Sequence, residues 1–445
     1  MTTRPVEKLI CSLAVPTIIS MLVTALYNIA DTFFVSNLGN DQTGAVGVVF
    51  PVMALIQAVG FFFGQGSGNY ISRALGRSDP GSAAKMASVG FFTSFVFTGL
   101  LAFTALFFAE PIAEVLGSTA LIRPHAVSYM KWILLGAPFM ASSYVLNNQL
   151  RFQGNAVYSM IGIGGGAVLN VGLDPLFISV FGMGVSGAAL ATVISQFFSF
   201  CLLLVATAKS DSLKIRLRNY RFEWKYYREI FIGGTPSLFR QGLSSVATAF
   251  LNRAAGICGA EAAIAAMTVV SKLMQFAGSA LIGFGQGFQP VCGFNWGAGL
   301  YDRVRKAIVF CLKVSFAALV LIAAAGIIFA PQIIGIFRDD ENVIRIGAAA
   351  LRAQCVALPL TGVTIMTNMA LQNIGKVFRA TLLAMSRQGL MFIPVVLILP
   401  ALFGLDGVIY SQGVADVLAF AVALPLIISL FRELKKRASE PEGER

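Results

Sequence analysis

Long apolar runs recur from one end of the chain to the other, and short polar stretches separate them. Each run has about 20 or more residues, the length that an α-helix needs to cross ~30 Å of hydrocarbon. A β-barrel is excluded, because its strands would be about ten residues long and would alternate apolar with polar residues. The pattern therefore predicts an all-α integral membrane protein with twelve transmembrane helices, at 9–35, 44–68, 83–108, 126–150, 156–181, 184–207, 229–256, 261–290, 305–330, 346–373, 377–403 and 406–431.

Composition supports a membrane protein and changes how the net charge is interpreted. The chain has 445 residues, of which 57% are hydrophobic and only 12% are charged, whereas a soluble protein has about 25% charged residues. A net charge of +12 would suggest nucleic-acid binding in a soluble protein. Here the basic residues gather in alternate loops, as the positive-inside rule expects. We therefore expect no nucleic-acid partner, and a multi-pass protein of the inner (cytoplasmic) membrane with both termini in the cytoplasm.

The two halves of the chain repeat the same motifs at a nearly constant separation. Pro16 corresponds to Pro236, and Gly64-Gln65-Gly66 corresponds to Gly285-Gln286-Gly287. Six spans in each half predict two bundles related by a pseudo-two-fold axis along the membrane normal, an architecture of transporters. The predicted domains are an N-lobe at 1–207, a basic cytoplasmic linker at 208–228, a C-lobe at 229–431 and a cytoplasmic tail at 432–445.

Asn170 and Asp174 lie one helical turn apart inside an otherwise apolar run. Ionisable groups at such depth are costly and mark functional sites. Asp31 and Thr192 are expected at a similar height on other helices, so three helices deliver oxygen ligands to one layer. These oxygens suit a hard cation such as Na⁺. They suit a proton equally, because two adjacent desolvated carboxylates do not both stay ionised cheaply.

Several motifs together resemble the MATE (multidrug and toxic compound extrusion) family, and within it the DinF/MepA-like branch. They are Pro16 with Tyr27-Asn28-Ile29-Ala30-Asp31, Gly64-Gln65-Gly66, Gly76-Arg77, the run from Asn148 to Gly154, the run from Gly182 to Ala188, and Gly283 to Pro290 followed by Gly297-Ala298-Gly299. The resemblance implies a cation-coupled antiporter that exports cationic, amphipathic compounds. It also implies a cation site made of Asp31, Asn170, Asp174 and Thr192, with the first three as metal ligands if the ion is Na⁺. Tyr27, Tyr129 and Asn147 would line the same cavity.

The second half departs from the first in its charged residues. Leu251 occupies the position that corresponds to Asp31, and the equivalent of Asp174 falls near Pro394. Basic and amide side chains appear instead, at Arg240, Gln241 and Lys272. They are either a polar wall for the substrate or a structural pair in which Arg240 or Lys272 contacts Asp416.

The sequence as a whole indicates a secondary-active multidrug antiporter that works as a monomer on small molecules in the lipid bilayer. Its coupling ion is H⁺ or Na⁺, and no other cofactor is expected. An enzyme is disfavoured, because no phosphate-binding G-x-x-x-x-G-K-[ST] motif and no nucleophile–base cluster occur. Three alternatives remain: a lipid-linked saccharide flippase of the same superfamily, an exporter of a non-cationic metabolite, and a membrane enzyme that acts on lipid head groups.

Overall fold

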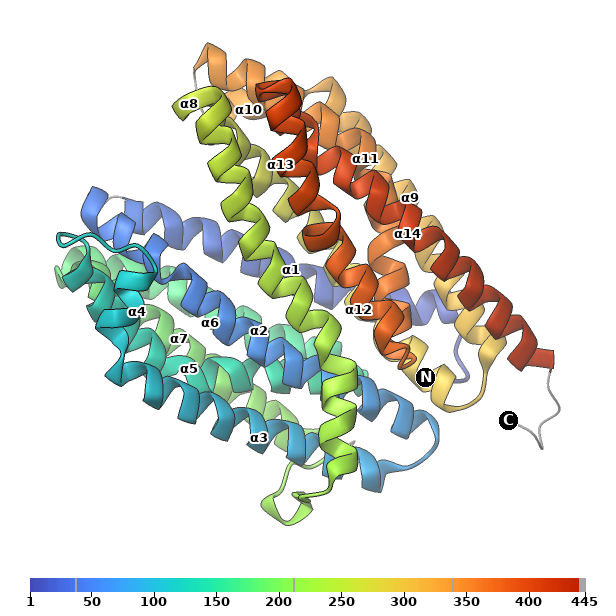
Figure 1. Cartoon of the computed structure of the whole chain (residues 1–445). Helices are drawn as coiled ribbons and strands as arrows, with labels where there is room; N and C mark the ends of the chain where they lie inside the picture. Colours follow the sequence, from blue (N-terminus) through green and yellow to red (C-terminus); the bar gives the residue numbers. More distant parts are fainter. Residues whose placement is uncertain (37, 211–212, 338–339, 440–445) are drawn as a thin grey trace. The chain divides into compact units, whose positions relative to one another are not determined.

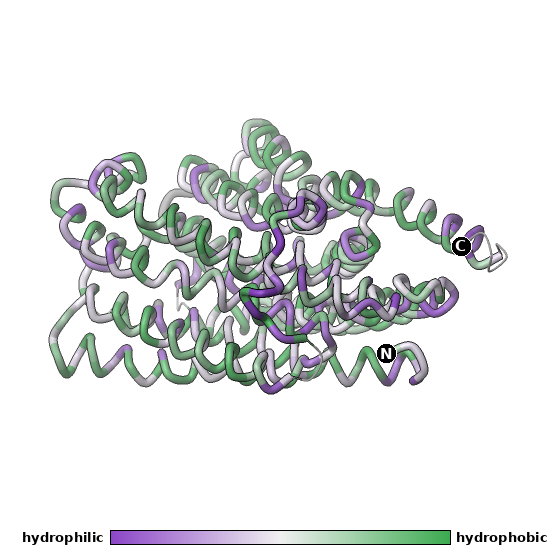
Figure 2. Tube along the Cα trace, turned by 90° about the horizontal axis from the view of Figure 1, so that it is seen from below, coloured by the Kyte–Doolittle hydropathy of each residue, from purple (hydrophilic) through white to green (hydrophobic). Residues whose placement is uncertain are grey.

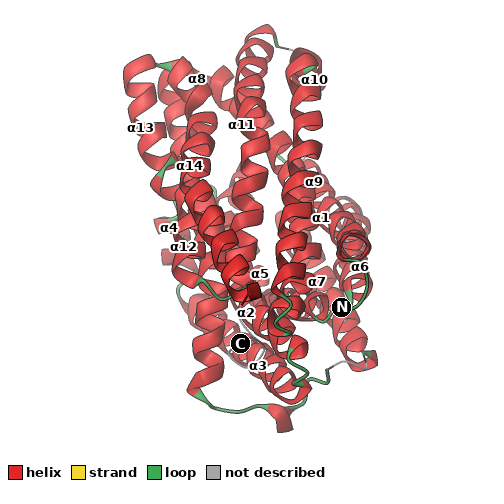
Figure 3. Ribbon diagram, turned by 90° about the vertical axis from the view of Figure 1, so that its right-hand side faces the viewer, coloured by secondary structure: helices red, strands yellow, loops and turns green. Residues whose placement is uncertain are grey.

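The protein is almost entirely helical, and the described part of the chain contains no strand (Figure 3). The structure is a computed structural model that describes residues 1–36, 38–210, 213–337 and 340–439. The elements are α1 (Val6–Ser36), α2 (Asn40–Gly76), α3 (Pro80–Phe107), α4 (Ala109–Val115), α5 (Arg123–Phe152), α6 (Ala156–Pro175), η1 (Leu176–Val180), α7 (Gly184–Lys209), η2 (Leu217–Asn219), α8 (Trp224–Gly297), α9 (Tyr301–Ile328), α10 (Ala330–Phe337), α11 (Glu341–Asn373), α12 (Val377–Met385), η3 (Ser386–Leu390), α13 (Phe392–Phe403) and α14 (Leu405–Ser439).

Ten segments of the described chain are long and apolar enough to cross a membrane. Figure 2 shows hydrophobic residues along most of the helical trace, with hydrophilic residues concentrated near turns and near the C-terminal end. Two further segments complete the predicted twelve: α5, and the first part of α8. The 30 residues of α5 run between the spanning helices α2, α3 and α7, which hide its polar side chains from lipid. The twelve-helix prediction is confirmed.

Helix α8 is assigned without a break over 74 residues, where the sequence predicted two helices and a loop. A straight helix of this length would extend roughly 110 Å, far more than one membrane crossing needs. It is not straight, because a Cβ built on Gly256 would lie 3.3 Å from Cδ1 of Ile264, two helical turns further on. The sharp bend at this point divides α8 into two spanning arms.

The chain forms two compact units. The N-terminal unit is Ser12–Leu238, and the C-terminal unit joins Met1–Cys11 to Phe239–Arg445. In the N-terminal unit, α5 packs against α2, α3 and α7, and α6 packs against α7 (Figure 1). In the C-terminal unit, α11 packs against α9 and α14, and α13 packs against α14 (Figure 1). The lobe boundaries taken from the repeat stay a prediction.

Close backbone contacts explain part of the Gly64-Gln65-Gly66 motif. A Cβ on Gly66 would lie 2.4 Å from the backbone oxygen of Ile230, at the start of α8. No side chain can be placed there unless a helix backbone moves, so glycine sets the distance between α2 and α8. An ion pair also joins α2 to the start of α8, since Arg73 Nη2 lies 2.7 Å from Glu229 Oε2.

The predicted basic linker packs onto the N-terminal unit where it is described. Leu213 is buried, and the backbone N–H of Arg216 donates to Ser88 Oγ on α3 at 3.3 Å. Tyr220 stacks edge-on against Phe92, with ring centroids 6.2 Å apart. Residues 211–212 of the linker, and 440–445 of the predicted tail, lie outside the described residues.

One hydrogen bond occurs at corresponding places in the two halves of the chain. Asn147 Nδ2 donates to the backbone oxygen of Ser159 at 3.1 Å, and Asn368 Nδ2 donates to that of Ala380 at 2.6 Å. Each bond joins the end of one long helix, α5 or α11, to the start of the next. The turn between them contains a glycine with positive φ in both halves, at Gly154 (φ 91) and Gly375 (φ 84).

Two π-helical segments interrupt spanning helices. Segment η1 follows Pro175 directly and is therefore next to the polar face of α6. Segment η3 lies between α12 and α13 and contains Arg387. Such segments carry one residue more than α-helical geometry allows for and are frequent at functional sites.

Candidate functional site

The polar face of α6 is buried inside the N-terminal unit. Asn170 is 2% exposed and Asp174 is fully buried, although the helix around them is apolar. This face packs against α7, where small residues allow a close approach: a Cβ on Gly166 would lie 2.9 Å from the backbone oxygen of Ser195. A carboxylate enclosed in this way has lost its water and needs another partner.

Asp31 on α1 is brought to the same place. Its carboxyl group lies within electrostatic range of that of Asp174 on α6. Both carboxyl groups also interact with the phenol of Tyr129 on α5 and with that of Tyr27, one turn before Asp31. The structure thus gathers Tyr27, Asp31, Tyr129 and Asp174, which the sequence analysis singled out, into one cluster.

Thr192 on α7 joins this cluster through Asn170. The amide Nδ2 of Asn170 lies 3.5 Å from Thr192 Oγ1, which is a long hydrogen bond. Tyr129 is completely buried, and its hydroxyl donates to Met53 Sδ at 3.6 Å. Four helices, α1, α5, α6 and α7, therefore supply the side chains of the site.

Several oxygens of the cluster are buried and accept no hydrogen bond from any described residue. They are Oδ1 of Asp31, Oδ1 of Asn170, and both carboxylate oxygens of Asp174. No lysine or arginine among the described residues forms an ion pair with either aspartate. Buried acceptors normally have a donor or a cation, so these oxygens form a set that a proton or a small cation would satisfy.

A small cavity adjoins Asn170 and has room for roughly one water molecule. Tyr27 and Asn170 line it together with Tyr144, Ser195 and Gln196, which the sequence analysis did not single out. Ser195 follows Thr192 by one helical turn on α7, so its spacing was a usable signal. Its hydroxyl is also buried without a hydrogen-bond partner among the described residues.

Asn147 lies at a different point of the unit. Its Nδ2 donates both to the backbone oxygen of Ser159, at 3.1 Å, and to Ser159 Oγ, at 2.6 Å. These bonds tie α5 to the first turn of α6, whereas Asn170 and Asp174 are in the last turns of that helix. Asn147 and Tyr129 were both predicted to line one cavity with Tyr27. Neither is among the residues that line the small cavity beside Asn170, and the role of Asn147 stays a prediction.

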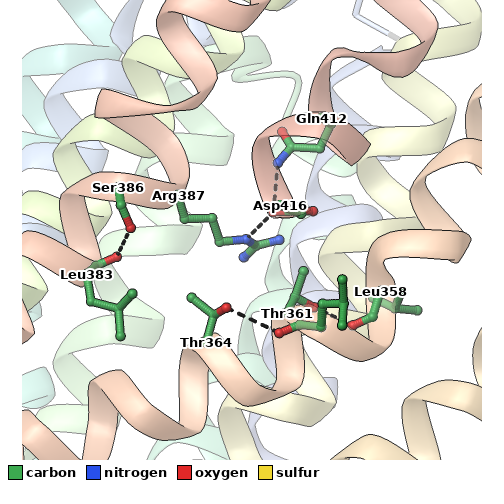
Figure 4. A network of polar contacts seen from close by, with 9 residues as sticks. Leu358, Thr361, Thr364, Leu383, Ser386, Arg387, Gln412 and Asp416 are labelled. Atoms are coloured by element: carbon green, nitrogen blue, oxygen red, sulfur yellow. Dashed lines mark hydrogen bonds and ion pairs between the residues drawn. The ribbon is translucent and has the colours of Figure 1, made fainter. Parts of the chain in front are cut away.

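The C-terminal unit contains a different set of polar residues. Arg240 and Gln241 are half-buried on the first arm of α8, and Lys272 is exposed on the second arm. The expected partner of Asp416 needs correcting: it is neither Arg240 nor Lys272 but Arg387, whose Nε lies 2.8 Å from Asp416 Oδ1 (Figure 4). Segment η3 presents Arg387 to α14, and an α-helical pattern does not anticipate this orientation.

Comparison with known proteins shows which family this chain resembles. The MatE family model matches residues 16–176 and again 236–398, one block in each half of the chain. Multidrug export protein MepA of Staphylococcus saprophyticus is 30% identical over 428 residues, which cover 94% of this chain and 93% of the relative. MepA of Staphylococcus aureus is 30% identical over 433 residues, covering 96% of this chain and 95% of the relative.

Solved structures agree with the sequence relatives. An outward-facing multidrug resistance MATE family transporter of the MOP superfamily superposes with a TM-score of 0.92 at 28% identity, covering 97% of each chain. The two family blocks coincide with the internal repeat, and the relatives align over nearly their full length. This chain belongs to the MATE family of transporters.

Proposed function

We propose that this protein is a secondary-active multidrug exporter, which exchanges H⁺ or Na⁺ for amphipathic organic compounds by alternating access. The names of its relatives support export, since the staphylococcal proteins are multidrug export proteins and the solved structure is a multidrug resistance transporter. In this proposal the chain works as a monomer in the cell inner membrane, with both termini in the cytoplasm. The basic loops of the sequence support that orientation.

The observation that carries ion coupling is the pair of aspartates in the N-terminal unit. Asp31 and Asp174 interact electrostatically, Asp174 is fully buried, and no basic residue of the described chain pairs with them. Two such carboxylates cannot both stay ionised without a proton or a cation beside them. If the ion is Na⁺, Asp31, Asn170 and Asp174 supply its oxygen ligands.

Coupling requires that the ion bind two conformations with different affinity, since a ligand with equal affinity for both shifts nothing. The site has the parts for such a difference, because α6 ends at Pro175 and continues as the π-helical η1 only two residues after Asp174. In this mechanism, neutralising the aspartates favours a conformation in which α6 and η1 pack closely. Losing the ion restores the repulsion and opens the cluster.

The test is gradient-driven efflux of ethidium from proteoliposomes, with a pH gradient and a Na⁺ gradient imposed separately. In the double variant Asp31→Asn, Asp174→Asn, the efflux rate should be the same with and without the gradient, because the site no longer takes up the ion. The gradient that drives the native protein identifies the ion.

Asp41→Asn is the matched control, because Asp41 is an exposed acid in the first turn of α2 and takes the same substitution. It should transport at the native rate. Native gradient-driven efflux by the double variant, at native protein abundance, would refute the proposed coupling site.

A further inference from the structure

The C-terminal unit encloses a charged cluster that has more positive than negative charge. Figure 4 shows Arg387 of η3 and Asp416 of α14 pointing toward one another. Asp416 Oδ1 accepts hydrogen bonds from Arg387 Nε at 2.8 Å and from Gln412 Nε2 at 3.2 Å. Thr361 and Thr364 of α11 lie beside the pair, but their hydroxyls donate to backbone oxygens of their own helix.

Arg240 of α8 belongs to the same cluster. A Cβ on Gly389, in η3, would lie 2.8 Å from Cδ1 of Leu243, so α8 passes directly beside the π segment. Arg240 precedes Leu243 by one helical turn, and its guanidinium interacts electrostatically with that of Arg387. The cluster thus has two guanidinium groups and one carboxylate.

These charges lie deep in the membrane. Arg387 follows the start of α12 by ten residues, and Asp416 follows the start of α14 by eleven, so each lies roughly 15 Å along its span. Arg387 is nevertheless 30% exposed. A guanidinium at this depth is costly in hydrocarbon, and such groups face the bundle interior or a water-filled cavity, so we infer that its open side meets water.

Structural pairing does not account for Arg240. Asp416 is already bonded to Arg387 and Gln412, and Arg240 forms no ion pair with any described acid. Its Nε is buried without a hydrogen-bond partner among the described residues. A half-buried, unpaired charge beside a like charge destabilises a fold, so we expect its partner to be an anion from outside the chain.

We propose that Arg240 and Arg387 bind a carboxylate group carried by the transported compound. Guanidinium groups hold carboxylates through paired, charge-assisted hydrogen bonds, and Asp416 neutralises only one of the two. The preferred substrates are then amphipathic compounds with an acidic group, including zwitterions, rather than purely cationic ones. This inference rests on the proposed export function and names the substrate class.

The test is equilibrium binding to the purified full-length protein in detergent, followed by fluorescence anisotropy. The probes are rhodamine B, which has a free carboxylate, and its ethyl ester, which lacks one and is otherwise matched. The native protein should bind the acid more tightly than the ester. Arg240→Gln and Arg387→Gln should each weaken acid binding about tenfold, the loss expected for one charge-assisted contact, and change ester binding less than about twofold.

Arg379→Gln is the matched control. Arg379 is an arginine of the same spanning segment, and its Nη1 donates to Ser429 Oγ at 3.1 Å. This variant should keep the preference for the acid. An equal loss of both dyes in Arg240→Gln, or a native protein with no preference, would overturn the proposal, because both outcomes remove any role for the carboxylate.

A second variant predicts a change of opposite sign. In Asp416→Asn the amide oxygen still accepts from Gln412, but the charge that neutralises Arg387 is gone. Acid binding should therefore strengthen several-fold while ester binding stays the same; selective weakening of acid binding would contradict the proposal. No ion gradient enters these measurements, so their failure is distinguishable from a failure of ion coupling at Asp31 and Asp174.

Discussion

At the scale of single residues, the corresponding hydrogen bonds of Asn147 and Asn368 help to distinguish structural residues from residues of the transport site. The two amides make the same bond at corresponding places, although the pair of Asp31 and Asp174 is present in only one half. A contact that is present in both halves supports the helix packing that the two halves have in common. We infer that Asn147 fastens α5 to α6 and supports the site from a distance.

Asn147→Ala should therefore lower stability and leave the coupling ion unchanged. The substitution removes the two hydrogen bonds from Asn147 Nδ2 to Ser159, each worth about 0.5–1.5 kcal/mol net. A thermal unfolding assay on the purified protein should show a lower Tm, and efflux per folded molecule should respond to the same gradient as the native protein. An unchanged Tm with lost coupling would instead place Asn147 in the transport site, as the sequence resemblance implies.

The acid pair could be predicted from the sequence because ionisable residues stand out in apolar runs. Asp31 and Asp174 were identified in this way, and the structure brings them together. Arg387 was not identified, although it lies ten residues inside the predicted span 377–403, where the same signal applies. Its significance comes from the neighbours that η3 gives it, and a one-dimensional pattern does not contain them.

At the scale of elements, most spans could be predicted to within a few residues, because hydrophobic length is a strong signal. The break between the seventh and eighth spans was expected as a loop, yet α8 continues through it as a bent helix. Alanine, the best helix former, is frequent between Ala254 and Ala266 and explains why helix persists there. Segment η1 could not be predicted, since its residues are as apolar as the surrounding helix. Segment η3 does differ from its apolar flanks, through Ser386, Arg387, Gln388 and Gly389, but a polar composition does not by itself predict π geometry.

Helix α3 provides a test of local stability, because Asp79 caps its N-terminus. Asp79 Oδ1 accepts from the Ser82 N–H at 2.9 Å, and the hydrogen bonds from Ser82 hold the pKa of this exposed carboxyl below its usual value. Since the folded pKa is the lower one, the stabilisation is present above pH ~4 and is lost as the pH falls through the folded pKa.

Asp79→Ala should speed amide hydrogen exchange in the first turn of α3 about 2–5-fold at neutral pH. This corresponds to about 0.5–1 kcal/mol, the lower end for a helix cap because solvent screens the charge. The difference from the native protein should shrink as the pH falls below ~4 and disappear below the folded pKa of Asp79. Asp79→Asn keeps an acceptor for Ser82 and is the control, so exchange as fast as in Asp79→Ala would show that the hydrogen bond is not the cause.

At the scale of the whole molecule, the repeat is the main regularity. The MatE family model matches each half once, and the positive-φ glycines recur, at Gly182 and Gly404 as well as at Gly154 and Gly375. Duplication of an ancestral half explains why the two halves share helices and turns. Their charged residues differ, since one half contains a pair of aspartates and the other a cluster of guanidinium groups. Sequence comparison of the halves could predict the frame, but it could not predict the side-chain contacts that distinguish them.

An experimental structure should show residues 1–207 and 229–431 as two six-helix bundles that superpose on one another. The reason is the constant separation of the paired motifs, together with an even number of spans in each half. Structure determination by crystallography or electron cryomicroscopy would check this. First helices that run in opposite directions in the two bundles would contradict it.

The π segments have a mechanical consequence for a protein of this kind. Each residue of an α-helix advances the chain by ~100° around the helix axis. One extra residue therefore rotates the side chains after it by about this angle relative to the side chains before it. If η1 tightened into α-helix, the side chains after it would rotate by about that angle relative to Asp174. The same conversion in η3 would swing Arg387 away from Asp416. Each half thus contains a π segment that could convert to α-helix and rotate the residues after it. In both halves this segment lies beside charged groups that a bound ion or solute would neutralise.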